Sequence, residues 1–160
     1  MRAYHRRRSD IQFRLEQLRM IEVVNRQRLR QMESKRWIAV AANALEAIGR
    51  TNANATIAFV SDLRMRELNR SFRGIDKTTD VLSFPAGPNE FPLTDDVSLG
   101  DIAISVQRAE LQARESGLSF DDEMAQLILH GLLHLCGYDH ETDDGEMNRL
   151  ELRLRRRLGI

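Results

Sequence analysis

Cysteine and long apolar runs are almost absent from this chain of 160 residues. A single cysteine, Cys136, excludes an internal disulfide and favours a reducing, cytoplasmic location. No stretch approaches the roughly 20 consecutive apolar residues of a membrane-spanning helix. The arginines near the N-terminus are not followed by an apolar segment, so we expect no secretory signal. Proline and glycine are also scarce, and the composition, 42% apolar and 30% charged, is typical of a compact soluble protein.

The net charge of zero is the sum of a basic N-terminal part and an acidic remainder. Residues 1–36 hold eleven Arg and Lys against four Asp and Glu, a balance of +7, so residues 37–160 carry −7. A basic N-terminal segment can follow a phosphate backbone, although a solvated helix face has the same composition. We expect residues 1–20 to be a basic extension, helical or disordered, and residues 21–160 to form a single domain.

Hydrophobic periodicity and capping residues predict four strands and five or six helices. The strands are expected at 21–25, 55–61, 81–85 and 99–105. The helices are expected at 9–19, from Ser34 to a stop at Gly49, at 62–72 after the cap Ser61, from the cap Ser105 to a stop at Gly117, from Ser119 to the turn at Gly137, and at about 143–158. These elements predict an α+β fold in which helices pack on one small mixed four-stranded sheet.

Two of these helices have informative apolar patterns. The helix at 62–72 is expected to turn Leu63, Leu68 and Phe72 inward. The helix that begins after Ser119 is apolar nearly all round its circumference, which is the pattern of a helix buried in the interior.

Three of the four histidines fall within HGLLHLCGYDH, residues 130–140, at the end of that central helix. His130 and His134 are four residues apart, so both side chains project from one face of the helix. Gly137 can adopt a positive φ and end the helix with a sharp turn, which would bring His140 back toward the other two. Three imidazoles with an open fourth position are the ligand set of a catalytic zinc site. Cys136 lies on a different side of the helix end, and we expect it to be a small buried residue and not a fourth ligand.

Zinc proteases with two helical histidines also need a glutamate directly after the first, as general base. Gly131 occupies that position here, which argues against peptide cleavage by that route. Four acidic residues follow nearby and are candidates for a general base or for hydrogen-bond partners of a ligand imidazole: Asp139, Glu141, Asp143 and Asp144. Their pattern is equally that of a capped, solvated turn.

Three blocks together carry a family resemblance. HGLLHLCGYDH, preceded by FRGIDKTTDVLSFP (72–85) and GDIAIS (100–105), resembles the YbeY family of bacterial rRNA maturation factors. The resemblance covers about residues 21–158 and leaves residues 1–20 outside the family pattern. It implies a metal-dependent hydrolase domain and a single-strand-specific endoribonuclease that matures the 3′ end of 16S rRNA and acts in ribosome quality control in the cytoplasm.

The resemblance also implies roles for single residues. One Zn²⁺ would be bound by His130, His134 and His140, and Arg73 would engage the RNA phosphate. We therefore predict Arg73 and His134 as the catalytic residues, with single-stranded RNA and the small ribosomal subunit as partners. Attack on the phosphate would come from a water molecule or from the 2′-OH of the RNA itself.

This chain departs from the family at Ile75, where the block usually has lysine, although Lys77 remains. Phe72 and Phe84 are the aromatic residues of the same region, and we expect both to belong to the core. Two further hypotheses stay open. One is a non-catalytic ribosome-assembly factor with a structural metal, and the other is a metalloprotease-like hydrolase, which Gly131 disfavours.

Overall fold

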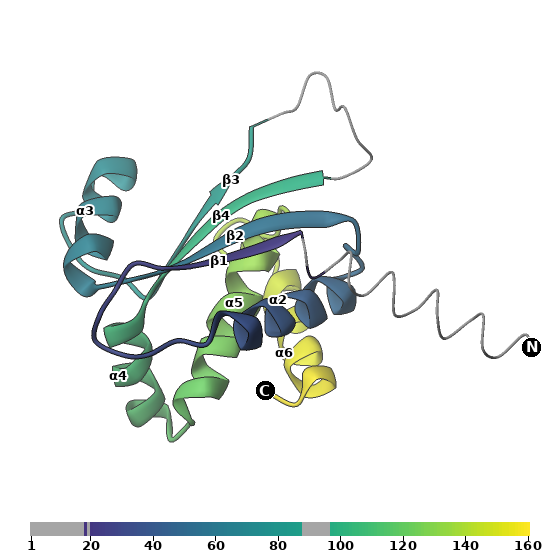
Figure 1. Ribbon diagram of the computed structural model, residues 1–160. Coiled ribbons are helices and arrows are strands. Elements are labelled where there is room, and N and C mark those ends of the chain that lie inside the picture. Colours follow the sequence, from purple (N-terminus) through teal and green to yellow (C-terminus); the bar gives the residue numbers. More distant parts are fainter. Residues whose placement is uncertain (1–17, 19, 88–96) are drawn as a thin grey trace, which may run out of the picture.

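The computed structural model of the protein describes residue 18 and residues 20–87 and 97–160. Four strands in this part of the chain form one sheet in the order β1-β2-β4-β3 (Figure 1). They are β1 (Ile21–Asn25), β2 (Ala53–Val60), β3 (Val81–Pro85) and β4 (Val97–Ser105). β1, β2 and β4 are parallel, and β3 runs antiparallel to β4. All four predicted strands are present, and β2 and β4 begin two residues earlier than predicted.

Five helices occur within the described ranges. They are α2 (Ser34–Ile48), α3 (Asp62–Arg73), α4 (Val106–Ser116), α5 (Phe120–Leu135) and α6 (Glu146–Leu158). The α+β prediction, with a mixed four-stranded sheet, is therefore confirmed. The helix predicted at 9–19 falls almost entirely outside the described residues. None of the helices described has the length and apolar character needed to cross a bilayer.

The helices are divided unequally between the two faces of the sheet. In Figure 1, α2, α5 and α6 lie together beneath the sheet, and α5 is in contact with α2, α4, α6, β3 and β4. Ile102 and Ile104 of β4 point into this main core, whereas Ala103 between them packs with Met65 of α3. Because successive strand residues point to opposite faces, α3 covers part of the other face. The central position predicted for α5 is confirmed, since its apolar residues are buried all round.

The inward face predicted for α3 is wrong at two of three positions. Leu63 and Phe72 are 69% and 67% exposed. The helix meets the sheet through Met65 and Asn69, which are buried, with Leu68 partly buried beside them. A helix with one narrow contact buries only the residues on that line, so Leu63 faces away and Phe72 lies at the margin. The expected core position of Phe72 is thus also wrong, whereas Phe84 is partly buried against the small core.

A β-bulge shapes the sheet next to β3. The β2–β4 pairing jumps from Asn54 with Ser98 to Ala55 with Gly100, leaving one extra residue on β4. Gly100 has φ +118°, and a Cβ there would lie 2.1 Å from the carbonyl oxygen of Phe84. Only glycine fits this close approach of two backbones.

Candidate metal centre

The three histidines of HGLLHLCGYDH come together in the structure. One nitrogen from each of His130, His134 and His140 lies within 4.8 Å of the others. The ring centroids are 4.7 Å apart for His130 and His134, and 5.5 and 5.2 Å from these to His140. Two rings are half-buried and that of His140 is exposed. This is a cluster of imidazoles around one point, open to solvent on one side.

The local backbone explains how the third histidine reaches the other two. α5 ends at Leu135, and the N–H of Gly137 donates to the carbonyl of His134 at 3.0 Å. Gly137 has φ +94°, the left-handed conformation that glycine adopts without strain. The chain therefore reverses directly after the helix and returns His140 to the face that carries His130 and His134.

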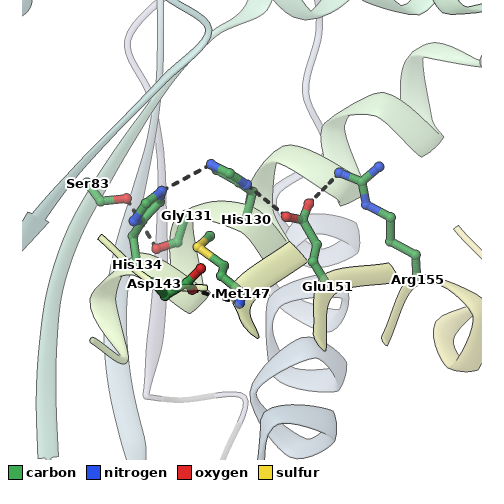
Figure 2. Close-up of polar contacts among 8 residues, drawn as sticks. All are labelled: Ser83, His130, Gly131, His134, Asp143, Met147, Glu151 and Arg155. Atoms are coloured by element: carbon green, nitrogen blue, oxygen red, sulfur yellow. Dashed lines mark hydrogen bonds and ion pairs between the residues drawn. The ribbon is translucent and has the colours of Figure 1, made fainter. Parts of the chain in front are cut away.

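His130 is oriented by a buried carboxylate from the last helix. Its Nδ1 lies 3.0 Å from Oε2 of Glu151 on α6, and Glu151 also accepts a hydrogen bond from Arg155 (Figure 2). Burial favours the neutral acid, but the hydrogen bond from His130 and the positive charges of His130 and Arg155 outweigh it and lower the pKa of Glu151. The Glu151 carboxylate accepts a hydrogen bond from the Nδ1–H of His130, and in this neutral tautomer the lone pair of the ring lies on Nε2. That nitrogen points into the cluster.

The surroundings of His134 favour its neutral form. Burial lowers the pKa of its imidazole, and the neighbouring His130 and His140 lower it further. The Nε2 atoms of His134 and His130 face one another at 3.1 Å, so at least one lone pair is directed between the rings. Neutral imidazole nitrogens converging on a shared point are the donors that Zn²⁺ and similar ions require.

Cys136 is not part of this cluster. The group that can hold a metal contains three histidine nitrogens and no sulfur among the residues described. Burial also raises the pKa of the Cys136 thiol, so the thiolate that a metal needs is disfavoured. Its side chain packs instead against the main core, so the candidate group consists of the three histidine nitrogens alone among the residues described.

The histidines and Arg73 line the same hollow, whose volume is about 840 Å³. Arg73 is the last residue of α3 and is exposed. Within the described ranges no ion pair holds its guanidinium. Arg73 and His130 are 57 residues apart in the sequence, and the fold places both in the lining of one hollow. Lys77 does not line the hollow; its carbonyl accepts a hydrogen bond from Asn69 at 2.8 Å.

The four acidic candidates divide into two pairs. Asp139 and Glu141 line the hollow, whereas Asp143 and Asp144 do not. The carboxylate of Asp143 accepts hydrogen bonds from the backbone N–H groups of Gly145, Glu146 and Met147 at 2.7 to 3.1 Å. These bonds, led by that of Met147, lower its pKa. Asp143 therefore caps α6, which begins three residues later than predicted.

Gly131 faces the sheet and not the histidines. A Cβ at this position would lie 2.9 Å from Cγ2 of Ile102 on β4. The hydroxyl of Ser83 on β3 donates to the Gly131 carbonyl at 3.1 Å, which fixes the helix against the sheet (Figure 2). At the position that holds the general base in zinc proteases, Ile102 thus leaves no room for a side chain in this protein.

Comparison with known proteins identifies the family. The family model described as Endoribonuclease YbeY matches residues 22–159. The chain belongs to the YbeY family. The resemblance predicted from the three sequence blocks is confirmed.

Relatives and a solved structure agree with this assignment. A protein named Endoribonuclease YbeY from Campylobacter fetus subsp. fetus is 49% identical over 111 residues, covering 69% of this chain and 78% of the relative. Another of that name from Nitratiruptor sp. is 41% identical over 138 residues, covering 86% and 88%. The solution structure of TM1509 from Thermotoga maritima matches with a TM-score of 0.60 and 28% identity, covering 87% of this chain and 89% of that one.

Sequence reasoning on this YbeY chain did not find Glu151. The candidates for a partner of a ligand imidazole were the acids that directly follow the histidines, and Glu151 is 21 residues from His130. A signal was nevertheless present. Met147 and Leu154 mark the buried face of α6, and Glu151 lies between them at helical spacing on that same face. A charged residue in such a position needs a partner in the interior.

Replacing Glu151 with glutamine should weaken metal binding in this YbeY protein by roughly 10- to 100-fold, the range found when an outer partner of a ligand histidine is lost. The amide keeps the size of the side chain, but its neutral oxygen is a weaker acceptor for the Nδ1–H of His130, and its NH2 group can donate to Nδ1 instead, so the tautomer of His130 is no longer fixed. Competition with a zinc-chelating dye measures the change in Kd. The nuclease activity of the Glu151→Gln variant should be lower than that of the unmodified protein at limiting zinc and should recover with excess zinc.

Glu146→Gln provides the matched control, because Glu146 is exposed in the first turn of the same helix. It should leave the zinc Kd unchanged. Equal zinc affinities for Glu151→Gln and the unmodified protein would refute the positioning role of Glu151.

Proposed function

We propose that this protein is a zinc-dependent endoribonuclease that cuts single-stranded RNA. The observation that carries the proposal is the cluster of three imidazoles in one hollow with Arg73, in a chain whose relatives are named endoribonucleases. We further propose that its substrate is the 3′ end of 16S rRNA, that it acts in ribosome quality control on the small subunit, and that it works in the cytoplasm. These finer assignments follow the family resemblance.

The proposed metal ligands are His130, His134 and His140, holding one Zn²⁺. Their donor set fits this ion because all three are imidazoles, two of them on a rigid buried helix. A bound zinc ion supplies concentrated positive charge that stabilises the negative charge developing on a phosphate during cleavage. Glu151 maintains His130 in the tautomer that offers Nε2 to the ion.

Arg73 is the proposed phosphate clamp. A guanidinium presents two parallel N–H donors that match two nonbridging phosphate oxygens, and it stays charged at every physiological pH. Its exposed side chain at the rim of the histidine hollow is free of ion pairs within the described ranges, so its donors are available to substrate. We assign it to orient the scissile phosphate and to neutralise charge there.

The proton of the attacking hydroxyl needs an acceptor. Three acidic residues line the hollow, Asp80, Asp139 and Glu141. Asp80 accepts hydrogen bonds from the Val81 N–H and the Gln112 amide, so we assign the role to Asp139 or Glu141, either of which can take the proton from a water molecule or from the 2′-OH of the RNA. Peptide hydrolysis through a glutamate after the first histidine is opposed by the packing of Gly131 on Ile102.

Cleavage of a labelled RNA tests the proposal. Zinc-loaded protein should cut a single-stranded oligonucleotide and leave the same sequence intact in a duplex, and a chelator should stop the reaction until zinc is restored. A 2′,3′-cyclic phosphate on the product, together with loss of cleavage at a single 2′-deoxy nucleotide, would identify attack by the 2′-OH. Zinc-loaded protein that binds the RNA and never cuts it would refute the enzyme assignment and favour an assembly factor.

A further inference from the structure

A large aromatic side chain is exposed beside the metal centre. Phe72 precedes Arg73 in the last turn of α3 and is 67% exposed. Its ring meets that of Phe84 on β3 edge-on, with centroids 4.9 Å apart and planes at 65°. Phe84 is anchored in the small core with Met65 and Leu82. The Phe72 ring is therefore packed on Phe84 on one side, while most of its surface faces solvent.

This aromatic pair separates two hollows. Phe72 and Phe84 line the hollow that contains the histidines and Arg73. They also line a second hollow of about 820 Å³ on the face of the sheet that carries α3. Small side chains such as Ala58 and Ala103 contribute to its lining. The two hollows thus adjoin at the aromatic pair, whose rings line both of them.

Positive charge is present on both sides of the pair. Arg73 lines the first hollow on the side of the aromatic pair, together with the acidic residues Asp80, Asp139 and Glu141. Arg26 and Arg64 line the second hollow, where Asp101 is the single acidic residue. Arg26 forms no ion pair within the described ranges. Arg64 contacts Glu67 at 2.9 Å, an exposed pair of low strength. Arginines flanking exposed aromatic rings form the arrangement that binds single-stranded nucleic acid.

We propose that Phe72, supported by Phe84, is a stacking platform for the nucleobase next to the scissile phosphate, and that the second hollow receives the strand beyond it. The inference rests on the proposed function and deepens it by assigning the path of the RNA. Every base has a π-face, so stacking on Phe72 favours unpaired RNA without selecting a sequence. In a duplex the bases are stacked on each other and this contact is unavailable, which gives the preference for single strands a structural cause.

The experiment compares cleavage of a single-stranded RNA by zinc-loaded variants at position 72. Phe72→Ala should lower kcat/KM roughly ten-fold or more, the loss expected for one base–aromatic stack. Phe72→Trp, which retains a stacking surface, should keep most of the activity. Leu63→Ala is the matched control: Leu63 lies on the same helix, is 69% exposed and lines neither hollow. It should cut RNA as the unmodified protein does.

A second series moves one abasic nucleotide along the RNA on either side of the cleaved bond. At one position the missing base should lower kcat/KM of the unmodified protein by the same factor as Phe72→Ala. Combining that RNA with Phe72→Ala should cause no further loss, because both changes remove one contact. Full additivity at every position would overturn the platform and leave Phe72 with an indirect role.

Failure of the stacking platform and failure of the endoribonuclease function would be seen with different proteins, the Phe72→Ala variant and the unmodified protein. Unchanged cleavage by Phe72→Ala would overturn the platform, while the endoribonuclease function would stand. Absence of cleavage by the unmodified zinc-loaded protein would overturn both.

Discussion

Replacing His134 with alanine should abolish zinc binding and RNA cleavage together. His134 is the half-buried proposed ligand whose Nε2 faces that of His130 at 3.1 Å, so its loss leaves two imidazoles, of which one is exposed. We expect the zinc Kd to rise by more than the roughly 100-fold that loss of an outer partner causes. Cleavage should fall by a factor on the order of 10³ or more, since charge stabilisation at the phosphate is lost.

Metal content of the purified variant and cleavage of a labelled single strand measure the two effects. Cys136→Ala is the control, because Cys136 is two residues away and outside the histidine cluster. It should bind zinc and cut RNA normally. A His134→Ala protein that retains zinc at unmodified affinity would show that the three histidines are not the ligand set.

Replacing Arg73 with alanine should lower cleavage by roughly 10²- to 10³-fold and leave zinc affinity unchanged. That magnitude is typical of removing one donor that stabilises charge in the transition state. Arg73 is exposed, so the variant should fold with an unchanged melting temperature. Arg73→Lys should restore only part of the activity, because an ammonium group cannot present two parallel donors to the phosphate.

Arg70→Ala provides the comparison for general loss of positive charge. Arg70 is also in the last turn of α3 and does not line the histidine hollow. Its replacement should have a small effect that disappears as salt is raised. Equal losses for Arg70→Ala and Arg73→Ala would assign the effect to the overall charge of the helix and contradict a specific clamp.

The starts of three helices were predictable because a serine caps each of them. Ser61, Ser105 and Ser119 accept hydrogen bonds from backbone N–H groups three residues later, as their cap positions predicted. The glycines that end α2 and α4 adopt the left-handed conformation. Such interactions span three or four residues, so the local sequence contains all the information that they need.

The approach of the three histidines was predictable for the same reason. Helical spacing places His130 and His134 on one face, and Gly137 permits the reversal that returns His140. The link from His130 to Glu151 depends instead on how α6 packs against α5, which no spacing within either helix specifies. The position of Arg73 beside the histidines likewise depends on where α3 rests on the sheet, and only the family resemblance indicated it.

The error at Phe72 has a related cause. Apolar periodicity identifies the side of a helix that is suited to burial, but the extent of burial depends on how much of the helix the neighbouring element covers. Phe72 lies on the expected side of α3 and touches the sheet through Phe84, yet its ring is covered on one side only and is still 67% exposed. A residue that follows the pattern of a core position and remains exposed is a reasonable candidate for binding.

The hydrogen bond between His130 and Glu151 can form only late in the synthesis of the protein. α6 follows every other described element in the chain, so the histidines of α5 are synthesised before the carboxylate that orients one of them. During translation the imidazole of His130 can therefore still exchange between tautomers. Its tautomer is fixed only when α6 has left the ribosome and packed on α5. A nascent chain that lacks this helix therefore does not yet have the proposed metal site in its final form.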